Sequence, residues 1–462
     1  MAKRNKRRSL SGHRRGGFLK KFSLTLIIVA VIAAAVSGLI LFETEDPGLT
    51  LEKEITYLGS NVELPFKVYD KRSGVKSIVV SLEQQGVKSE IFNRSFERQA
   101  WFKPAGPATV AETVNIDTKN AQLQDGKADL VVTVRDFSLN GLLKGNETVK
   151  RIPVIIDSVP PRVSITHAQN YIRPGGSGIV IYEVSENSPR HGVQIDDLFF
   201  QGFPLDQHPK QFISYIALPW NSEEPQNASV IARDEAGNEG KALIHMNFKA
   251  VAKKSDRINV SDNFLKNKLP EFQERYPGMQ GTPIEQYLHA NRDIRQQNAA
   301  TISKICSNPD PKQLWNDRFL RMAGANRAGF ADQRTYFYNG SPVDNQTHLG
   351  IDIASTARAE VRAANSGKVA YADYLGIYGY MIILDHGQGL YSLYSHLSKI
   401  DTTVGSMVEK DALIGHTGAT GMAGGDHLHF SMLIHGIFVT PKEWWDQHWI
   451  DVNIKEFLKP GA

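Results

Sequence analysis

The sequence predicts a mainly β protein with a single transmembrane helix at its N-terminus. Three observations support this fold class: an uncharged apolar stretch at 22–42, many short alternating strands between residues 43 and 250, and histidine-bearing strands between residues 345 and 432. In chain order we expect the membrane helix, two immunoglobulin-like β-sandwich modules, a helical connector and a C-terminal domain built on an antiparallel β-sheet.

The composition is that of a folded chain, with 41% hydrophobic and 22% charged residues. Its only cysteine, Cys306, excludes intramolecular disulfides and cysteine-based zinc sites, so a metal would need His, Asp or Glu ligands. Residues 1–42 hold nine of the 53 basic residues and no acidic residue, which leaves 44 basic against 49 acidic residues in the remainder. Because that remainder is mildly acidic, we expect no nucleic-acid partner.

The N-terminus is predicted to be a membrane anchor. Residues 1–21 are basic, and residues 22–42 carry no charge. A helix of that length spans ~30 Å, the thickness of a hydrocarbon core, and its basic flank stays in the cytoplasm. We therefore expect a cytoplasmic tail, a single-pass anchor in the cytoplasmic (inner) membrane, and the rest of the chain in the periplasm or another extracytoplasmic space. A cleaved signal peptide is the alternative, because Ala33, Ala34 and Ala35 offer small residues near a cut.

Two similar β modules are expected between the anchor and residue 250. The segment VTVRDFSLN, which begins at residue 132, aligns with VIARDEAGN, which begins at residue 230, so Asp136 and Asp234 lie 98 residues apart. About a hundred residues per copy with many short strands fits an immunoglobulin-like sandwich. RDEAGN is similar to a turn signature of bacterial Ig-like repeats, which act as spacers, adhesins or lids, so the modules are candidates for binding a regulatory protein partner. Their expected bounds are 43–157 and 158–250.

Residues 251–330 are expected to form a connector of short helices. Apolar residues recur there at helical spacing, and Pro283 and Pro311 interrupt the pattern. Cys306 falls in one of these helices, where we expect a buried and unreactive thiol.

Three histidine-bearing segments of the C-terminal domain indicate a metal site. In THLGIDIA, strand alternation puts His348 and Asp352 on one face with only a glycine between them, which leaves room for a bound group. In GGDHLHFSML, the same period puts His427 and His429 on one face. The strand LYSLYSHLS ends with His396.

This set of side chains suits zinc chemistry. Two neutral imidazoles and one carboxylate, with the fourth position left to water, form the ligand set of a catalytic zinc site. Zinc lowers the pKa of its bound water from ~15.7 to about 7, which makes a hydroxide nucleophile available at neutral pH. The remaining histidines can orient the water, accept its proton and stabilise the oxyanion. The predicted cofactor is therefore Zn²⁺.

The motifs HLGID, YSHLS and HLHF, in this order, resemble those of the lysostaphin-type (LytM-like) zinc metallopeptidases, which cut peptide bonds in bacterial cell-wall peptidoglycan. The resemblance covers residues 330–442. The sequence departs from the family at Ser431, where Glu or Gln is usual, and we expect this residue to tune the site without abolishing it. The roles that the resemblance implies are zinc binding for His348, Asp352 and His429, and catalysis for His396 and His427.

The peptidase-like domain is expected at 331–442, followed by a C-terminal helix at 443–462. Thr440 and Glu443 fit a capping box at the start of that helix. The tryptophans that follow Glu443 are expected to pack against the domain.

The function predicted from these features is that of a membrane-anchored zinc endopeptidase, which hydrolyses cross-links or stem peptides of bacterial peptidoglycan. The alternative is a scaffold that binds peptidoglycan without cutting it, or an activator of another cell-wall hydrolase. A weaker third interpretation is an adhesin. The sequence leaves open which bond is cut, whether the anchor is cleaved, the oligomeric state, the partner, and whether the upstream modules cover the cleft.

Overall fold

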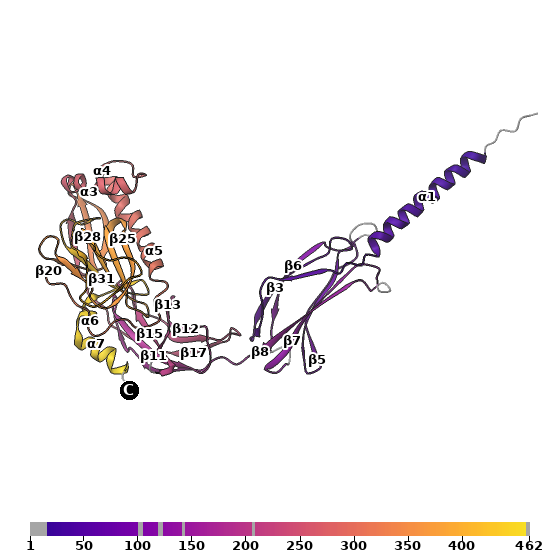
Figure 1. The fold of residues 1–462 in the computed structure, drawn as a ribbon, viewed down its shortest axis with the longest axis horizontal. Coiled ribbons are helices and arrows are strands. Elements are labelled where there is room, and N and C mark those ends of the chain that lie inside the picture. Colours follow the sequence, from indigo (N-terminus) through magenta and orange to yellow (C-terminus); the bar gives the residue numbers. More distant parts are fainter. Residues whose placement is uncertain (1–15, 100–104, 119–122, 141–143, 206–207, 459–462) are drawn as a thin grey trace, which may run out of the picture. The chain divides into compact units, whose positions relative to one another are not determined.

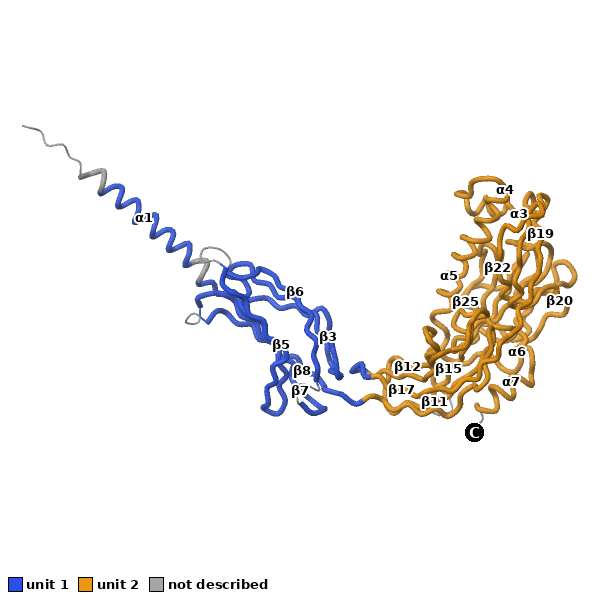
Figure 2. The backbone as a smooth tube through the Cα atoms, turned by 180° about the vertical axis from the view of Figure 1, so that it is seen from behind, with its two compact units in different colours: residues 1–159, 235–238 blue, residues 160–234, 239–462 orange. Residues whose placement is uncertain are grey.

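The computed structural model describes residues 16–99, 105–118, 123–140, 144–205 and 208–458 (Figure 1). The described chain is mainly β and divides into two compact units, residues 1–159 with 235–238 and residues 160–234 with 239–462 (Figure 2). Most of the basic tail expected at 1–21 lies outside the described residues. The domain boundaries expected from the sequence divide the chain more finely than these two units, and they stay predictions.

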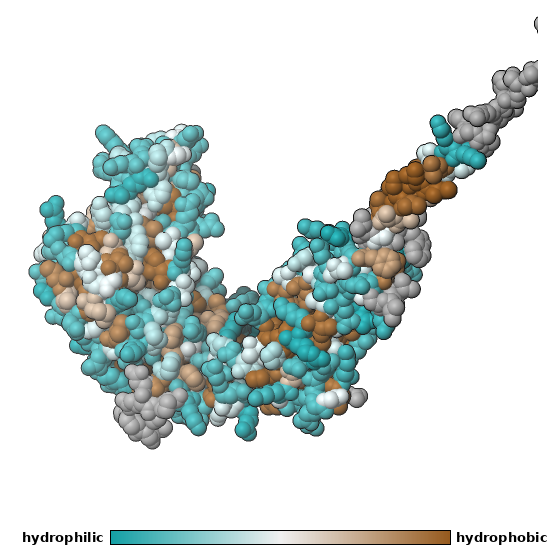
Figure 3. All heavy atoms as spheres, turned by 45° about the vertical axis from the view of Figure 1, so that its right-hand side comes forward, coloured by the Kyte–Doolittle hydropathy of each residue, from teal (hydrophilic) through white to brown (hydrophobic). Residues whose placement is uncertain are grey.

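One apolar helix, α1, occupies Gly16–Leu41. Its segment Lys20–Gly38 has a mean hydropathy of 2.1 over 19 residues, and no part of that segment is buried against the protein. In Figure 3 much of the visible surface of this helix is coloured as hydrophobic. A helix of this length and composition can cross a membrane, although a signal sequence has the same properties. The helix begins before the expected anchor, because Lys20 and Lys21 continue it toward the N-terminus.

The strands of the first unit form a two-layered sandwich. One sheet has the order β1-β3-β6 and the other the order β2-β8-β7-β4-β5. Leu64 and Phe66 of β3 share one core with Val80 of β4 and Val132 of β7, and each is at most 1% exposed. The strands are β1 (Gly48–Leu51), β2 (Tyr57–Leu58), β3 (Val62–Tyr69), β4 (Val75–Gln84), β5 (Val87–Ser95), β6 (Thr109–Ile116), β7 (Gly126–Asp136) and β8 (Glu147–Ile156).

A second two-sheet module begins the other unit. Its sheets have the orders β14-β15-β11-β9 and β13-β12-β16-β17, and β10 pairs with β18. Sheets therefore form in both segments where the sequence predicts β modules, and the immunoglobulin-like identity of the modules stays a prediction. The strands are β9 (Val163–Ala168), β10 (Tyr171–Ile172), β11 (Ser177–Val184), β12 (Arg190–Ile195), β13 (Leu198–Gln201), β14 (Phe203–Leu205), β15 (His208–Ala217), β16 (Ala228–Arg233), β17 (Glu239–Leu243) and β18 (Asn247–Phe248).

The connector is helical in its first part, as predicted. Pro283 starts α4 directly after the N-cap Thr282, which forms a capping box with Glu285. Cys306 follows α5 and is buried, and burial raises the pKa of its thiol. Two strands that the sequence did not indicate, β19 and β20, flank the helices. The elements are β19 (Ser255–Asn259), α3 (Asp262–Arg275), α4 (Pro283–His289), the π-helical turn η1 (Ala290–Ile294), α5 (Arg295–Ile305) and β20 (Ala325–Ala328).

The C-terminal domain is built on an antiparallel sheet with the order β20-β23-β31-β27-β26-β25-β29, and β32 pairs with β31. This part of the chain also forms two three-stranded sheets, with the orders β19-β21-β22 and β24-β30-β28. Their strands are β21 (Asp332–Tyr338), β22 (Ser341–His348), β23 (Ile351–Ala354), β24 (Glu360–Arg362), β25 (Gly367–Tyr374), β26 (Tyr380–Asp385), β27 (Leu390–Leu397), β28 (Lys399–Ile400), β29 (Met407–Val408), β30 (Leu413–His416), β31 (Leu428–Ile434) and β32 (Ile437–Val439); the short helix η2 covers Gly376–Tyr378.

The C-terminal segment is three short helical pieces where the sequence predicted one helix. These are α6 (Pro441–Trp445), α7 (Gln447–Asn453) and the 3₁₀ turn η3 (Lys455–Leu458). The predicted capping box is wrong: Thr440 is the N-cap of α6, but its side chain forms no capping bond within the described chain. Glu443 instead accepts hydrogen bonds from Arg173 at 2.8 Å and from the hydroxyl of Ser177 at 2.9 Å, so it binds the second module.

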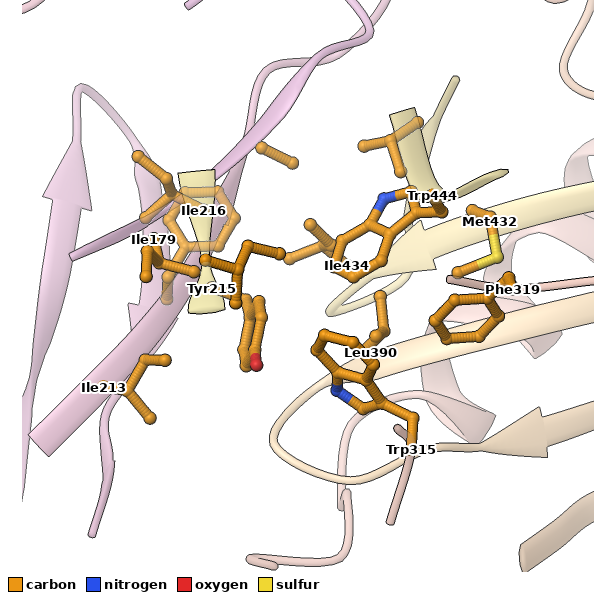
Figure 4. Packing of buried hydrophobic residues seen from close by; sticks show 14 of the residues in the cluster. Ile179, Ile213, Tyr215, Ile216, Trp315, Phe319, Leu390, Met432, Ile434 and Trp444 are labelled. Atoms are coloured by element: carbon orange, nitrogen blue, oxygen red, sulfur yellow. The ribbon is translucent and has the colours of Figure 1, made fainter. Parts of the chain in front are cut away.

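The second module and the C-terminal domain share one hydrophobic core. Tyr215 of β15 lies 6.2 Å from Trp444 of α6 between ring centroids, and Trp315 packs on the other side of Trp444 at 5.7 Å. Figure 4 shows Ile216 on the module side of this core and Ile434 on the domain side. The predicted packing of the tryptophans is confirmed for Trp444, which is 0% exposed.

The change Trp444→Ala is expected to lower the free energy of unfolding of the second unit by about 3–5 kcal/mol, because it leaves a cavity in the shared core. Tyr171→Ala removes an aromatic ring that is 70% exposed in the same unit, so it should change that free energy by less than ~0.5 kcal/mol. Urea unfolding followed by circular dichroism measures both. Equal effects of the two changes would contradict the shared core.

Candidate active site

Three strands bring the predicted metal ligands together. His348 ends β22, Asp352 lies in β23 and His429 lies in β31, and the pairing of β23 with β31 sets Asp352 directly opposite His429. The sequence predicted one strand through THLGIDIA, and this is wrong, because β22 ends at His348 and β23 begins at Ile351 in another sheet. The glycine between them does not leave an open space. A Cβ atom on Gly350 would lie 2.5 Å from His429 Nε2, so only glycine fits there.

The donor atoms of these three residues converge on one point. His348 Nε2, Asp352 Oδ1 and His429 Nδ1 each lie 2.9 Å from the other two. The three residues are 6%, 8% and 5% exposed, so little water screens them from one another. The structure therefore brings together the three residues that were predicted to bind metal.

Hydrogen bonds on the far side of each imidazole decide which ring nitrogen carries the proton. His348 Nδ1 lies 2.7 Å from the carbonyl oxygen of Gly329, which can only accept, so Nδ1 is protonated and Nε2 has a lone pair. Ser431 Oγ donates to the carbonyl oxygen of Leu349 at 2.8 Å, so it accepts from His429 Nε2 at 3.1 Å. His429 Nδ1 consequently has a lone pair as well. The sequence predicted that Ser431 tunes the site, but it did not predict these hydrogen bonds.

The arrangement fits a zinc ion. Two unprotonated imidazole nitrogens and a carboxylate oxygen at 2.9 Å repel one another unless a cation lies among them. Nitrogen and carboxylate donors of this number are those that zinc takes in catalytic sites, where a further position stays open. His348, Asp352 and His429 are the residues that would hold the ion.

Asp352 is kept ionised by its neighbours. Burial raises its pKa, but the close contacts with His348, His427 and His429 outweigh burial and hold the pKa well below its usual range. The second carboxylate oxygen, Oδ2, accepts a hydrogen bond from Arg334 of β21 at 3.1 Å. Arg334 thereby orients Asp352 so that Oδ1 points to the histidines. No motif marked Arg334 in the sequence, because its contact depends on the pairing of β21 with β22.

His396 reaches the cluster through an unusual backbone conformation. In a regular strand the side chain of Ser395, which pairs with His429, would share the face of that histidine and His396 would point the other way. His396 has a φ of 63°, which breaks the alternation, and its ring centroid lies 5.8 Å from that of His429. Its Nδ1 lies 2.9 Å from the carbonyl oxygen of Thr420, so Nδ1 donates and Nε2 is free to accept a proton. Burial, with His427 and His429 nearby, holds the pKa of His396 well below its usual value.

His427 lies at the open side of the cluster. Its Nδ1 is 2.7 Å from the carbonyl oxygen of Gly425, and its Nε2 is 3.6 Å from Asp352 Oδ1. Burial lowers the pKa of His427, but the interaction with Asp352 outweighs burial and the net change is upward. The ring centroids of His427 and His396 are 4.9 Å apart, so the two residues predicted to be catalytic lie side by side next to the predicted metal ligands.

The cluster lies in a cavity of about 960 Å³. Residues of the connector form much of its wall, and Trp220 of the second module also lines it. Lys268 of α3 donates to the carbonyl oxygen of Ala419, and Glu271 accepts from the backbone of Gly421 at 2.7 Å. These bonds fix α3 to the glycine-rich loop 418–425 beside the site. The helical connector is therefore part of the site and does not merely link it to the modules.

Two other histidines of this domain, His386 and His416, have polar partners away from the site. His386 is bonded to the carbonyl oxygen of Ser366 and to Ser392 Oγ, each at 2.7 Å. His416 pairs with Asp401 at 2.9 Å near the surface. Neither contacts the cluster formed by the five predicted site residues.

Comparison with known proteins places this domain in a family. Residues 346–441 match the model of Peptidase family M23, which confirms the predicted resemblance to lysostaphin-type peptidases for the C-terminal domain. The DD-carboxypeptidase/endopeptidase Mpg of Neisseria meningitidis serogroup B is 36% identical over 94 residues, 20% of this chain and 22% of the relative. The murein hydrolase activator EnvC of Escherichia coli K12 is 34% identical over 95 residues, 21% of this chain and 23% of the relative.

The matched region spans less than a quarter of the length of these two relatives. Among solved structures, the catalytic domain of the antimicrobial peptidase lysostaphin from Staphylococcus simulans aligns with a TM-score of 0.21 at 25% identity. That alignment covers 31% of this chain and 96% of the other.

The protein is expected to bind one zinc ion per chain, and His429→Ala is expected to remove it, because His429 Nδ1 is one of the three converging donors. His427→Ala is the matched control, since this neighbour two residues away was not predicted to be a ligand. Mass spectrometry of the metal content after dialysis measures both. Loss of zinc from His427→Ala, or its retention in His429→Ala, would contradict the assignment.

Ser431→Ala is expected to weaken zinc binding about 10–100-fold, because His429 loses the acceptor that fixes its protonated nitrogen. Ser395→Ala is the control: Ser395 is buried on the neighbouring strand opposite His429, and its Oγ has no hydrogen-bond partner within the described residues. Titration against a chelator of known affinity compares the two variants. If both variants bind zinc equally tightly, the hydrogen bond between Ser431 and His429 Nε2 does not strengthen zinc binding.

Proposed function

We propose that this protein is a membrane-anchored zinc endopeptidase that hydrolyses peptide bonds of cell-wall peptidoglycan. The observation that carries the proposal is the grouping of five side chains with different tasks. Three of them offer converging lone pairs that suit zinc. The other two, His396 and His427, lie next to them with their ring centroids 4.9 Å apart. A site that only stored or transported metal would have no need of the second pair.

The division of work within the site follows from its hydrogen bonds. Zinc bound at the three ligands would supply Lewis acidity, which acidifies water and polarises a peptide carbonyl. His396 and His427 each donate through Nδ1 to a backbone carbonyl, so each has Nε2 available for the reaction. One of them can accept the proton of the attacking water while the other, in its protonated form, donates to the oxyanion. Arg334 keeps Asp352 oriented throughout.

The shape of the site suits a peptide. A cavity of about 960 Å³ is lined in part by the connector and in part by loop residues such as Gly424, where an extended chain can approach the backbone closely. Its wall also carries Trp220, Tyr287 and Tyr378. The bound substrate is inferred to be a peptidoglycan cross-link or stem peptide, because the first relative reported above is named as a carboxypeptidase and endopeptidase.

The alternative function is that of an activator or scaffold, as the name of the second relative suggests. An activator needs neither a metal nor a proton-transferring residue. A protein with only that function would therefore have no need of all five site residues. The modules then serve as a surface for a regulatory protein partner in either case. We favour the enzyme because the full constellation is present.

The proposed location is the cytoplasmic membrane, with α1 as a single-pass anchor and the peptidase domain on the extracytoplasmic side. It is supported by the apolar segment Lys20–Gly38 and by the basic residues that precede it in the sequence.

His396→Ala is expected to lower the rate of peptidoglycan cleavage at least 100-fold while zinc remains bound, because a proton acceptor is lost and the ligands are untouched. His416→Ala should leave the rate within about twofold, since His416 pairs with Asp401 away from the site. The release of muropeptides from purified peptidoglycan by the full chain in detergent, followed by mass spectrometry, gives both rates. A wild-type protein that binds zinc yet releases no fragment would favour the activator.

A further inference from the structure

The first module contains a second cluster of acidic side chains, far along the chain from the peptidase domain. Glu43 is the second residue after α1, Asp70 directly follows β3, and Asp136 ends β7. One carboxylate oxygen of each lies within 4.8 Å of one from the others. The three residues are 3%, 7% and 0% exposed. Three segments of the chain thus meet in a buried group of carboxylates.

No ion pair among the described residues balances the negative charge of this cluster. No lysine or arginine forms an ion pair with Glu43, Asp70 or Asp136 in the part of the chain that the structure describes; Arg72 is near in sequence, but its guanidinium pairs with the exposed Glu45. Burying several carboxylates together is unfavourable unless they bind protons or a cation.

Glu43 has a buried carboxylate oxygen that can bind a further group. Its Oε1 accepts from the backbone and the hydroxyl of Ser73, but its Oε2 is buried with no hydrogen-bond partner among the described residues. Burial, followed by the nearby Asp70 and Asp136, raises the pKa of Glu43 to about 7. Burial also raises the pKa of Asp136. A carboxylate oxygen in this position is strongly attracted to a cation.

The carboxylates are held in place by hydrogen bonds from neutral groups. Asp136 accepts from the backbone of Ser138 at 2.9 Å, and from the backbone and side-chain nitrogens of Asn146 at 2.7 and 2.8 Å. Ser73 Oγ lies 2.9 Å from Glu43 and 3.1 Å from Asp70. The group is therefore positioned by its surroundings even though its charge is not neutralised.

We propose that Glu43, Asp70 and Asp136 form a binding site for a calcium ion. The donors are all carboxylate oxygens from three separate segments, and calcium takes 6–8 oxygen ligands, including bidentate carboxylates, in flexible geometry. Zinc is disfavoured because the cluster offers no nitrogen or sulfur, and magnesium because it keeps several of its waters, for which a site this buried leaves little room. The ion would fasten the chain that leaves α1 to the first sandwich.

The second module repeats part of this pattern. Glu186 lies two residues after β11, and Asp234 directly follows β16. Strands β11 and β16 take the places in their module that β3 and β7 take in the first, since β9-β11-β15 corresponds to β1-β3-β6 and β12-β16-β17 to β4-β7-β8. Carboxylates therefore recur after matching strands of both modules, which is expected of a functional feature of the repeat.

Equilibrium dialysis of the metal-stripped full chain in detergent against 2 mM ⁴⁵Ca²⁺ tests the proposal. Glu43→Gln keeps the shape of the side chain and its bonds to Ser73 but removes the charge, so this variant is expected to bind one calcium ion fewer per chain than the wild type. Glu45→Gln, a change two residues away at an exposed position, is expected to bind as many ions as the wild type. Asp70→Asn provides a second loss variant, and circular dichroism verifies that each variant is folded.

Equal numbers of bound calcium ions in the wild type and in folded Glu43→Gln would overturn the proposal. The same holds if Glu45→Gln loses as much calcium as Glu43→Gln does, because the binding would then depend on general surface charge. An equal concentration of Mg²⁺ should displace little of the ⁴⁵Ca²⁺, and displacement of most of it would overturn the assignment to calcium. His429→Ala should retain full calcium binding, which separates this site from the peptidase centre.

Discussion

The pairing of β23 with β31 is the constraint on which the candidate active site depends. It places Asp352 opposite His429, where cross-strand side chains are neighbours, and a slip of one residue would turn one of the two to the other face. The pairing of β31 with β27 then brings Ser395 opposite His429, and the left-handed conformation of the next residue turns His396 to the same side. A single sheet register therefore sets the positions of three of the five side chains. His348 joins them because Gly350, which follows β22 directly after Leu349, can lie very close to His429 of β31.

Local sequence patterns predicted most of the secondary structure, but they failed at THLGIDIA, which contributes to two strands, and at the C-terminal helix, which is three helical pieces. The alternating runs predicted sheets in both module segments, helical spacing predicted α3 to α5, and the order of histidine motifs identified the five residues that the structure brings together. Features that depend on contacts between distant segments were missed. Arg334 reaches Asp352 only through sheet pairing, and the hydrogen bond from Ser431 to the carbonyl of Leu349 joins β31 to the turn between β22 and β23. For the same reason Glu443, assigned to a capping box by spacing, binds Arg173 of another module.

The second module and the connector pack directly against the peptidase domain, unlike independent modules in a series. Trp444 and Tyr215 join the second module and the domain in one core, while α3 contacts the loop beside the site through Lys268 and Glu271. Changes in the module or the connector can therefore reach the cleft through packed contacts. The first module has a separate hydrophobic core, and it contains the buried carboxylates proposed to bind calcium.

Hydrolysis of peptide bonds at the five-residue site is best tested by isotope labelling. Purified peptidoglycan would be digested by the zinc-loaded full chain in H₂¹⁸O, and the new carboxyl ends would be analysed by mass spectrometry. One ¹⁸O atom is expected in each newly formed carboxyl group, because the attacking oxygen comes from solvent. If the protein binds zinc in stoichiometric amount but forms no labelled ends, the site does not hydrolyse peptidoglycan and the domain is a binding or activating module.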